Sequence, residues 1–271
     1  MKIFKKRIEL IKEISKCKKL AFVPTMGALH KGHISLIKKA KKKSSEILVS
    51  IYINPKQFNS KKDFKKYPRR LKKDISILKK INISYLYIPR HNDIYSFIPK
   101  NKIFLDKFSK ILCGKFRPLH FKGVINVVNR LLEITKPKFL YLGMKDFQQL
   151  ILIKSHINRN KIKSNIIPCP TIRDESGVAI SSRNTQLSKN QLQKAAKIYK
   201  FIKKNKRKIF HKIINKKKSE VVKNLTQLGA AKVDYVECIN LAKKKLCKKP
   251  GENYNIFFAY YIGGVRLIDN L

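Results

Sequence analysis

The chain has 271 residues, and its 64 lysines and arginines outnumber its 16 acidic residues, which gives a formal net charge of +48. Hydrophobic residues make up 43% of the sequence and aromatic residues 10%, which is enough apolar surface for a sizeable core. A disordered basic tail is therefore excluded. The length predicts one large domain or two modest ones.

The charge is compatible with nucleic-acid binding, because basic domains attract phosphate backbones. Only 11 of the basic residues are arginine, however, and the lysines are spread along the whole chain. Arginine is the better residue for bidentate phosphate and base contacts. We interpret the charge as compositional bias toward lysine with adventitious nucleic-acid binding, and functional polyanion binding stays open as the alternative.

The cysteines indicate a reducing compartment. Their number is odd and none belongs to a C-x-x-C pair, which argues against a disulfide framework and a zinc site. Residues 1–20 are charged throughout and contain no apolar stretch of signal-peptide length. No run reaches the roughly 18 apolar residues of a membrane span. We expect a cytoplasmic protein with no membrane partner. The cysteines are Cys17, Cys113, Cys169, Cys238 and Cys247.

The first part of the chain alternates short apolar runs with helical patterns. Such alternation predicts right-handed βαβ units and a parallel sheet covered on both faces. The fold class that we expect is α/β, with a Rossmann-like doubly wound parallel sheet. Strands are predicted at 19–25, 47–53, 85–88, 139–142 and 162–167, and helices at 31–44, 63–80, 123–134 and 146–158. In the second of these helices, Leu71, Ile75 and Leu78 are expected to face inward.

The pattern changes after about Arg173. Strands without alternating helices predict a smaller α+β C-terminal domain, so we expect domains at 1–175 and 176–271. The lysine-rich run at 204–219 is typical of a solvated face. Helices are predicted at 189–206 and 220–228, and strands at 233–239, 255–261 and 265–268.

The strongest local signal is the sequence PTMGALHKGH at 24–33, between the first predicted strand and the first predicted helix. Ligands of open parallel sheets bind at the carboxyl ends of strands. A helix that begins there directs free backbone N–H groups and its positive dipole end toward an anion. Gly27 and Gly32 permit close backbone approach, and His30 and His33 are spaced to face one ligand. The segment predicts a nucleotide-phosphate site.

Two other interpretations of the histidine pair stay open. His30 and His33 could begin a zinc site, although no carboxylate or cysteine accompanies them. They could also be structural histidines with satisfied hydrogen bonds. The two glycines and the position between strand and helix favour the phosphate site.

The H-x-G-H string resembles the signature of the nucleotidyltransferase superfamily that includes class I aminoacyl-tRNA synthetases. The longer string PTMGALHKGH resembles the pantothenate synthetase (pantoate–β-alanine ligase) family, and further motifs agree in order over nearly the whole chain. These motifs are SIYINPKQF at 50–58, RPLHFKGV at 117–124, GMKDFQQL at 143–150, SSRN at 181–184 and RLIDN at 266–270.

The resemblance implies an ATP-dependent ligase. In this family, pantoate reacts with ATP to give pantoyl-adenylate and pyrophosphate, and β-alanine then displaces AMP to give pantothenate. His33 is usually assigned as a proton donor. Because pyrophosphate hardly needs a proton to leave, electrostatic stabilisation by His30 and His33 is the stronger role. Lys145 is the third expected catalytic residue, as a point charge on the phosphates.

The resemblance also implies the binding residues and partners. Asp146 could orient Lys145, cap a helix or help to hold the magnesium ion (Mg²⁺) of the nucleotide. We expect pantoate, β-alanine and ATP as small-molecule partners, no metal held by the protein alone, and a homodimer. The expected ATP-binding residues are Met26, Gly27, Ala28, Leu29, His30, Lys31, Gly32, His33, Gly143, Met144, Lys145, Asp146, Ile172, Ile180, Ser181, Ser182 and Arg183. The expected substrate-binding residues are Gln57, Gln149, Asn54, Arg117 and His120.

Departures from the family pattern leave some points open. Met144 stands where the family usually has Glu, and Leu119 replaces a usual Gly.

The phosphate-binding SSRN motif falls where the organisation changes, so we expect an active site between two domains whose closure excludes water. Another adenylyl- or cytidylyltransferase would explain H-x-G-H but not the paired glutamines.

Overall fold

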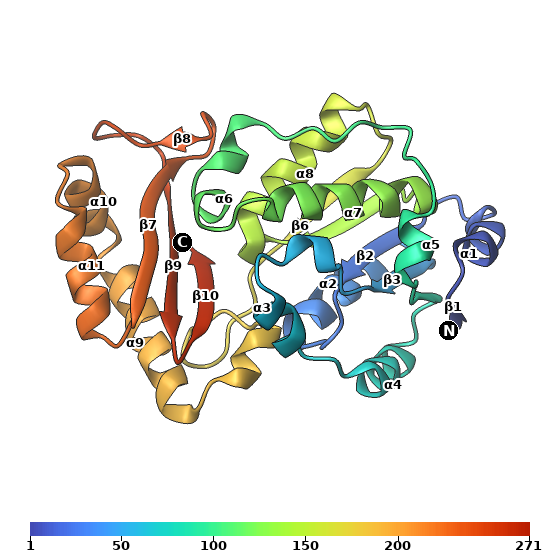
Figure 1. The fold of residues 1–271 in the computed structure, drawn as a ribbon, viewed down its shortest axis with the longest axis horizontal. Coiled ribbons are helices and arrows are strands. Elements are labelled where there is room, and N and C mark those ends of the chain that lie inside the picture. Colours follow the sequence, from blue (N-terminus) through green and yellow to red (C-terminus); the bar gives the residue numbers. More distant parts are fainter. The chain divides into compact units, whose positions relative to one another are not determined.

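The computed structural model describes residues 1–271 and divides into two compact units. The first unit contains Met1–Ser109 and Arg117–Pro170, and the second contains Lys110–Phe116 and Thr171–Leu271 (Figure 1). The second unit thus begins at 171 rather than at 176, and it includes a short earlier segment that the sequence placed in the first domain.

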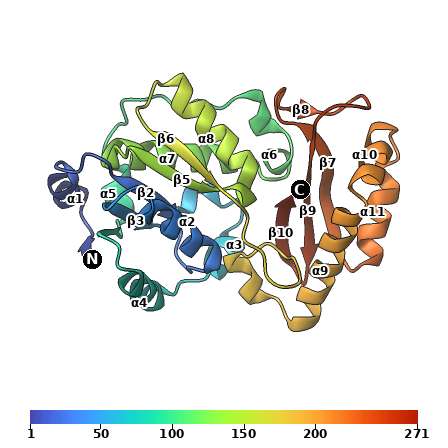
Figure 2. The same cartoon turned by 180° about the vertical axis from the view of Figure 1, so that it is seen from behind.

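The first unit contains a six-stranded sheet in which every pair of neighbouring strands is parallel, in the order β1-β4-β3-β2-β5-β6. Helices lie on both sides of this sheet (Figures 1 and 2). The Rossmann-like α/β prediction is confirmed. The strands are β1 (Lys2–Phe4), β2 (Ala21–Thr25), β3 (Ile47–Ile51), β4 (Tyr85–Tyr87), β5 (Phe139–Gly143) and β6 (Asn165–Cys169).

Several helices of the first unit pack against this sheet. The central strands read as continuous apolar runs, as expected for strands covered on both faces. The α-helices are α1 (Arg7–Ile14), α2 (Lys31–Lys41), α3 (Lys61–Lys66), α4 (Leu71–Ile81), α5 (His91–Tyr95), α7 (His120–Thr135) and α8 (Phe147–Arg159). The 3-10 helices are η1 (Pro55–Gln57), η2 (Lys107–Lys110) and η3 (Met144–Asp146).

The order of the strands places a topological switch point between β2 and β5. After β2 the chain adds β3 and β4 on one side, and it then returns to build β5 and β6 on the other. Crevices at such switch points, outside the carboxyl ends of the strands, are the usual ligand sites of open α/β sheets. The loops that leave β2, β3 and β5 are therefore the ones positioned to bind ligands.

The single helix predicted at 63–80 is wrong, because the chain forms α3 and α4 instead. Pro68 lacks a backbone N–H and disfavours helical geometry at the preceding residue, and Tyr67 is indeed extended. The predicted inward face of α4 is also partly wrong. Leu71 is 42% exposed, whereas Asp74 is buried beside Leu78. Strand β1 and helix α1 were not predicted from the sequence.

The second unit contains a four-stranded antiparallel sheet in the order β10-β9-β7-β8, packed with helices. The α+β prediction for the C-terminal part is confirmed. The lysine-rich run is not wholly solvated, because α10 buries Ile209 and Phe210. The elements are α6 (Cys113–Phe116), η4 (Ser182–Gln186), α9 (Lys189–Lys204), α10 (Lys206–Ile214), α11 (Lys218–Gln227), β7 (Lys232–Asn240), β8 (Lys245–Leu246), β9 (Asn255–Ile262) and β10 (Val265–Asn270).

All five cysteines are free thiols. None of the helices combines the length and the apolar character needed to cross a bilayer.

Candidate active site

The loop after β2 turns sharply through two residues in the left-handed region, Gly27 with φ +75° and Ala28 with φ +50°. A buried carboxylate stabilises this turn. The N–H of Ala28 donates to Oδ2 of Asp74 and the N–H of Leu29 to Oδ1, each at 2.8 Å. The N–H of Gly27 donates to Oγ1 of Thr25 at 3.1 Å.

The amides of Gly27, Ala28 and Leu29, which precede α2, all have protein acceptors. The free backbone N–H groups that the motif predicts are those of the first helical turn, which begins at Lys31. A nucleotide bound at this loop would therefore contact the side chains and the backbone amides of the residues that follow Leu29.

The two histidines lie together at the start of α2, as the spacing predicts. His30 is the N-cap residue, and its Nδ1 accepts from the N–H of Gly32 at 3.1 Å. Its ring centroid lies 4.0 Å from that of His33. The Nδ1 atom of His33 is buried and has no hydrogen-bond partner. Most buried polar atoms in folded proteins have a hydrogen-bond partner.

Both imidazoles are neutral at physiological pH. Burial, with a smaller effect from the charge of Lys145, lowers the pKa of His30 to about 4. Burial, together with the neighbouring His30, lowers the pKa of His33 to about 3. The effect of Lys145 on both rings indicates that the loops after β2 and β5 lie close together at the switch point. At neutral pH both rings can therefore donate and accept hydrogen bonds.

The loop after β3 carries a buried amide pair. Asn54 is 1% exposed and Gln57 is 9% exposed. Nδ2 of Asn54 donates to Oε1 of Gln57 at 3.4 Å, and the hydroxyl of Tyr95 donates to Oδ1 of Asn54 at 3.0 Å. These bonds leave Nε2 of Gln57 directed at Sδ of Met26, 2.8 Å away. The β2 and β3 loops therefore meet at the Gln57 amide.

The residues expected on the pantoate side bind the backbone of this loop. Nδ1 of His120 lies 2.7 Å from the carbonyl oxygen of Gln57, and Nη2 of Arg117 donates to the same oxygen at 3.4 Å. Because a carbonyl only accepts, Nδ1 of His120 carries the proton, and its Nε2 accepts from Nη1 of Arg117 at 3.3 Å. Arg117 and His120 thus position Gln57.

Helix α7 approaches the β3 loop very closely at Gly123. A Cβ atom on Gly123 would lie 2.1 Å from the carbonyl oxygen of Lys56, so only glycine fits. The carbonyl of Gly123 accepts from Nδ2 of Asn54 at 3.1 Å. The glycine of the RPLHFKGV motif is therefore required for packing beside the site.

The segment after β5 forms η3 and then α8. Nζ of Lys145 lies 3.4 Å from Oδ1 of Asp146. Gly143, Met144 and Gln149 are partly exposed at this end of the sheet. The neighbouring Gln148 is buried and donates to the carbonyl of Phe108 at 2.8 Å, so it has a structural role.

The second unit carries the other expected phosphate residues. The N–H of Ile180 donates to the carbonyl of Ile172 at 3.0 Å, which pairs the two expected isoleucines. The hydroxyl of Ser181 accepts from the N–H of Arg183 at 3.3 Å and caps η4, and Ser182 is buried.

A neighbouring arginine in the second unit is structural. Arg173 binds both carboxylate oxygens of Asp269, and its guanidinium lies over the ring of Tyr199. Asp269 belongs to the RLIDN motif, whose role in this unit is thus to anchor the chain at Arg173.

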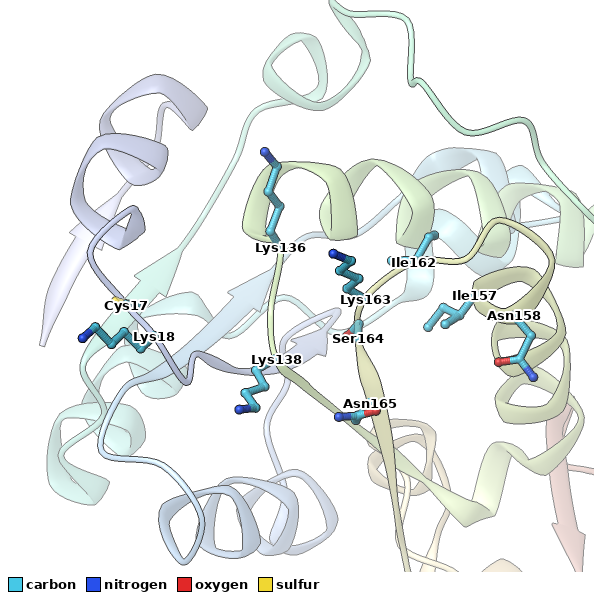
Figure 3. A pocket seen from close by; sticks show the side chains of 10 residues that line it. All are labelled: Cys17, Lys18, Lys136, Lys138, Ile157, Asn158, Ile162, Lys163, Ser164 and Asn165. Carbon is cyan, nitrogen blue, oxygen red and sulfur yellow. The ribbon is translucent and has the colours of Figure 1, made fainter.

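A surface hollow of about 570 Å³ lies elsewhere in the first unit (Figure 3). It is found at the amino ends of β5 and β6, opposite the loops described above, and none of the expected site residues lines it. Its lining residues are Cys17, Lys18, Lys136, Lys138, Ile157, Asn158, Ile162, Lys163, Ser164 and Asn165. No group of three or more His, Cys, Asp or Glu side chains is arranged to hold a metal ion.

The contacts of Asp74 and Tyr95 with these loops were not predicted from the sequence. Asp74 could have been identified from its position, because an acidic residue lies on the predicted apolar face of the helix between Leu71 and Ile75. Tyr95 gave no signal, because its contact with Asn54 depends on tertiary structure.

Comparison with known proteins decides the family. A model of the pantoate–β-alanine ligase family matches residues 2–271. The chain belongs to this family. It is a pantoate–β-alanine ligase and forms pantothenate. Pantothenate synthetase of Francisella tularensis subsp. novicida (strain U112) is 42% identical to this ligase over 270 residues, which cover 97% of this chain and 92% of the relative.

Solved structures agree with the sequence comparison. The pantoate–β-alanine ligase of Francisella tularensis, crystallised with β-γ ATP and β-alanine, superposes on this ligase with a TM-score of 0.86. It is 40% identical, and the match covers 100% of this chain and 97% of that one. The enzyme from Thermus thermophilus is 28% identical with a TM-score of 0.90, over 100% and 99% of the two chains.

Proposed function

We propose that the loops after β2, β3 and β5 catalyse the adenylation of pantoate. A carboxylate oxygen of pantoate attacks the α-phosphorus of ATP, and the bond to pyrophosphate breaks. The amine of β-alanine then attacks the acyl carbon of pantoyl-adenylate, and AMP leaves. The observation that carries this proposal is the pair of neutral imidazoles, His30 and His33, 4.0 Å apart at the switch point and close to Lys145.

Charge stabilisation is the proposed role of these three residues. Nδ1 of His30 is an acceptor, so its proton is on Nε2, from which it can donate to a phosphate oxygen. The ammonium of Lys145 supplies the positive charge. Fixed donors of this kind stabilise the charge that develops on departing pyrophosphate without first reorganising. We assign no proton transfer to His33, because an imidazole with so low a pKa is not protonated at neutral pH.

The Gln57 amide is the proposed anchor for pantoate. Its Nε2 donates to the thioether of Met26, which is a weak acceptor. A carboxylate or hydroxyl oxygen of pantoate would replace that contact with a stronger hydrogen bond. By resemblance, Gln149 supplies the second amide, and the substrate would lie between the two.

Asp146 is the residue that fits a nucleotide-bound Mg²⁺. Its side chain is 47% exposed, and it is already beside Lys145. Magnesium takes most of its ligands from phosphate and water, so one carboxylate suffices. The bound ion would neutralise phosphate charge, while Asp146 would orient Lys145.

Three further assignments rest on the resemblance. For the second unit by itself, we propose that Ser181, Ser182 and Arg183 form a phosphate-binding segment, with Ile172 and Ile180 beside the base. We also propose a homodimer, which sedimentation equilibrium would test. A cytoplasmic location is supported by the five free thiols.

The decisive experiment measures pyrophosphate release with ATP, Mg²⁺ and pantoate, and then pantothenate after β-alanine is added. Pyrophosphate release should require pantoate and should precede pantothenate. Lys145→Gln should slow release, whereas Lys203→Gln, a charge-matched change on α9, should not. Release that requires β-alanine, or pantothenate formed without AMP, would contradict the adenylate route.

A further inference from the structure

The carboxylate of Asp74 is an unusual feature beneath the nucleotide loop. Asp74 is 2% exposed, and no lysine or arginine forms an ion pair with it. Burial raises its pKa, and the two amide bonds from Ala28 and Leu29 oppose that change. The positive charges of Arg70 and Lys73 oppose the rise as well. A buried carboxylate is costly unless its oxygens are hydrogen-bonded, and here both accept backbone N–H groups.

The geometry of the turn explains this arrangement. Gly27 and Ala28 are consecutive residues with positive φ, a conformation that an L-residue such as Ala28 rarely adopts. An ionised carboxylate has two acceptor oxygens and no proton, so it can accept two adjacent N–H groups at once. An asparagine of the same shape would accept only one and would direct an NH₂ group at the other.

The turn separates the two halves of the candidate site in the first unit. Before it, Met26 contacts the Gln57 amide, and after it, His30 begins α2. The conformation of residues 27–29 therefore sets the position of the Gln57 side relative to the imidazole side. A misplacement of about 1 Å between reacting groups can lower a rate roughly 100-fold.

We propose that Asp74 is a positioning residue for the adenylation step, which holds the turn so that pantoate and the nucleotide phosphates are aligned. It does so through Ala28 and Leu29 and does not touch the substrates, because its side chain is buried beneath the loop. This inference rests on the proposed function of the β2 and β3 loops.

The first test is Asp74→Asn. The kcat for pantoate-dependent pyrophosphate release should fall roughly 10- to 100-fold. The conversion of supplied pantoyl-adenylate and β-alanine to pantothenate should change much less. Asp93→Asn is the matched control, since Asp93 also accepts a backbone N–H, from Arg7 at 2.9 Å, outside the site. It should lower the melting temperature and leave kcat per folded molecule unchanged.

A second variant disturbs the same contact through a change in the loop, at Gly27. A Cβ on Gly27 would lie 3.0 Å from Oδ2 of Asp74, so Gly27→Ala should disturb the turn while the carboxylate stays. If Asp74 acts by positioning the turn, the losses of Asp74→Asn and Gly27→Ala should be less than additive in the double variant. If Asp74→Asn folds poorly, Gly27→Ala alone provides the test, because it should show the selective loss of the first step.

The results of these experiments distinguish failure of the proposed function from failure of the positioning role of Asp74. If the unmodified protein releases no pyrophosphate with pantoate, the proposed function fails. If it does, and Asp74→Asn retains its kcat or slows both steps equally, the positioning role of Asp74 is wrong.

Discussion

The backbone N–H of Gly32 donates a hydrogen bond to Nδ1 of His30, with 3.1 Å between the two nitrogens. This bond fixes the neutral tautomer of His30 with its proton on Nε2. It also stabilises the first turn of α2, where a backbone N–H would otherwise lack a partner. One side chain thus both caps the helix and presents a donor.

The neutrality of the two imidazoles predicts the pH dependence of catalysis. With pKa values of about 4 for His30 and about 3 for His33, neither ring titrates between about pH 5.5 and pH 8. After correction for the ionisation of ATP itself, kcat/KM for ATP should show no histidine step in that range. His33→Ala should lower adenylation by roughly 10²–10³ at each pH. An acid limb near pH 6.5 that disappears in His33→Ala would refute this.

His156 predicts a pH dependence of stability. It is fully buried, Nε2 lies 3.0 Å from Oδ1 of Asn129, and burial lowers its pKa to about 4. In the unfolded chain its pKa is near 6.5, so between these values the unfolded state binds more protons. The free energy of unfolding should therefore fall as the pH drops from 6.5 to about 4, by up to about 3 kcal/mol from this residue.

Urea unfolding at several pH values tests the prediction for His156. The stability of His156→Gln should fall less steeply with decreasing pH than that of the unchanged protein, and carboxylates common to both cancel in the comparison. The exposed His211→Gln serves as the control. Parallel pH dependences for His156→Gln and the unchanged protein would show that His156 does not contribute.

The contact of His120 with the Gln57 carbonyl predicts a selective kinetic effect. Without the imidazole, the backbone of the β3 loop loses its 2.7 Å hydrogen bond, and the Gln57 amide is less well positioned. We expect His120→Ala to raise KM for pantoate about tenfold, the loss typical of one hydrogen bond, with little change in KM for ATP. The exposed neighbour Lys122→Ala should leave both constants unchanged. An equal rise in both would assign His120 a general structural role.

The close approach at Gly123 predicts a large effect on stability. Gly123→Ala forces α7 and the β3 loop apart, because Cβ would lie 2.1 Å from a backbone oxygen, and it should destabilise the fold by about 3 kcal/mol or more. Gly143→Ala is the matched control, since Gly143 has ordinary negative φ and open space around its Cβ position. Its free energy of unfolding should stay within about 0.5 kcal/mol. Similar losses in both variants would contradict the packing argument.

Much of the fold could be predicted because the strands of the first unit are continuous apolar runs. Strands β2, β3 and β5 and helices α2 and α8 lie close to their predicted positions, since the periodicity of 47–53 or 146–158 is local information. The break at Pro68 was also visible in the sequence and was overlooked. Strand β1 could not be predicted, because three residues carry no periodicity and its strand geometry depends on pairing with β4.

The chemistry of the site was less predictable than its location. The motif placed His30 and His33 together, but it gave no indication that Asp74 accepts hydrogen bonds from the amides of Ala28 and Leu29. That contact joins residues far apart in the sequence, and only the fold brings them together. For the same reason, the contacts of Arg117 and His120 with the carbonyl of Gln57 could not be predicted. Their expected contact with substrate stays a prediction.

The short segment Lys110–Phe116 has a consequence for biosynthesis. It belongs to the second unit, where the thiol of Cys113 lies 3.1 Å from the hydroxyl of Tyr235 and Phe116 packs near the same ring. On the ribosome, these residues emerge well before strand β7, so Tyr235 is not yet available to Cys113 and Phe116 while the first sheet assembles. A fragment that ends at 175 would lack Tyr235 altogether. Nascent chains are therefore expected to complete α6 only after β7 has been synthesised.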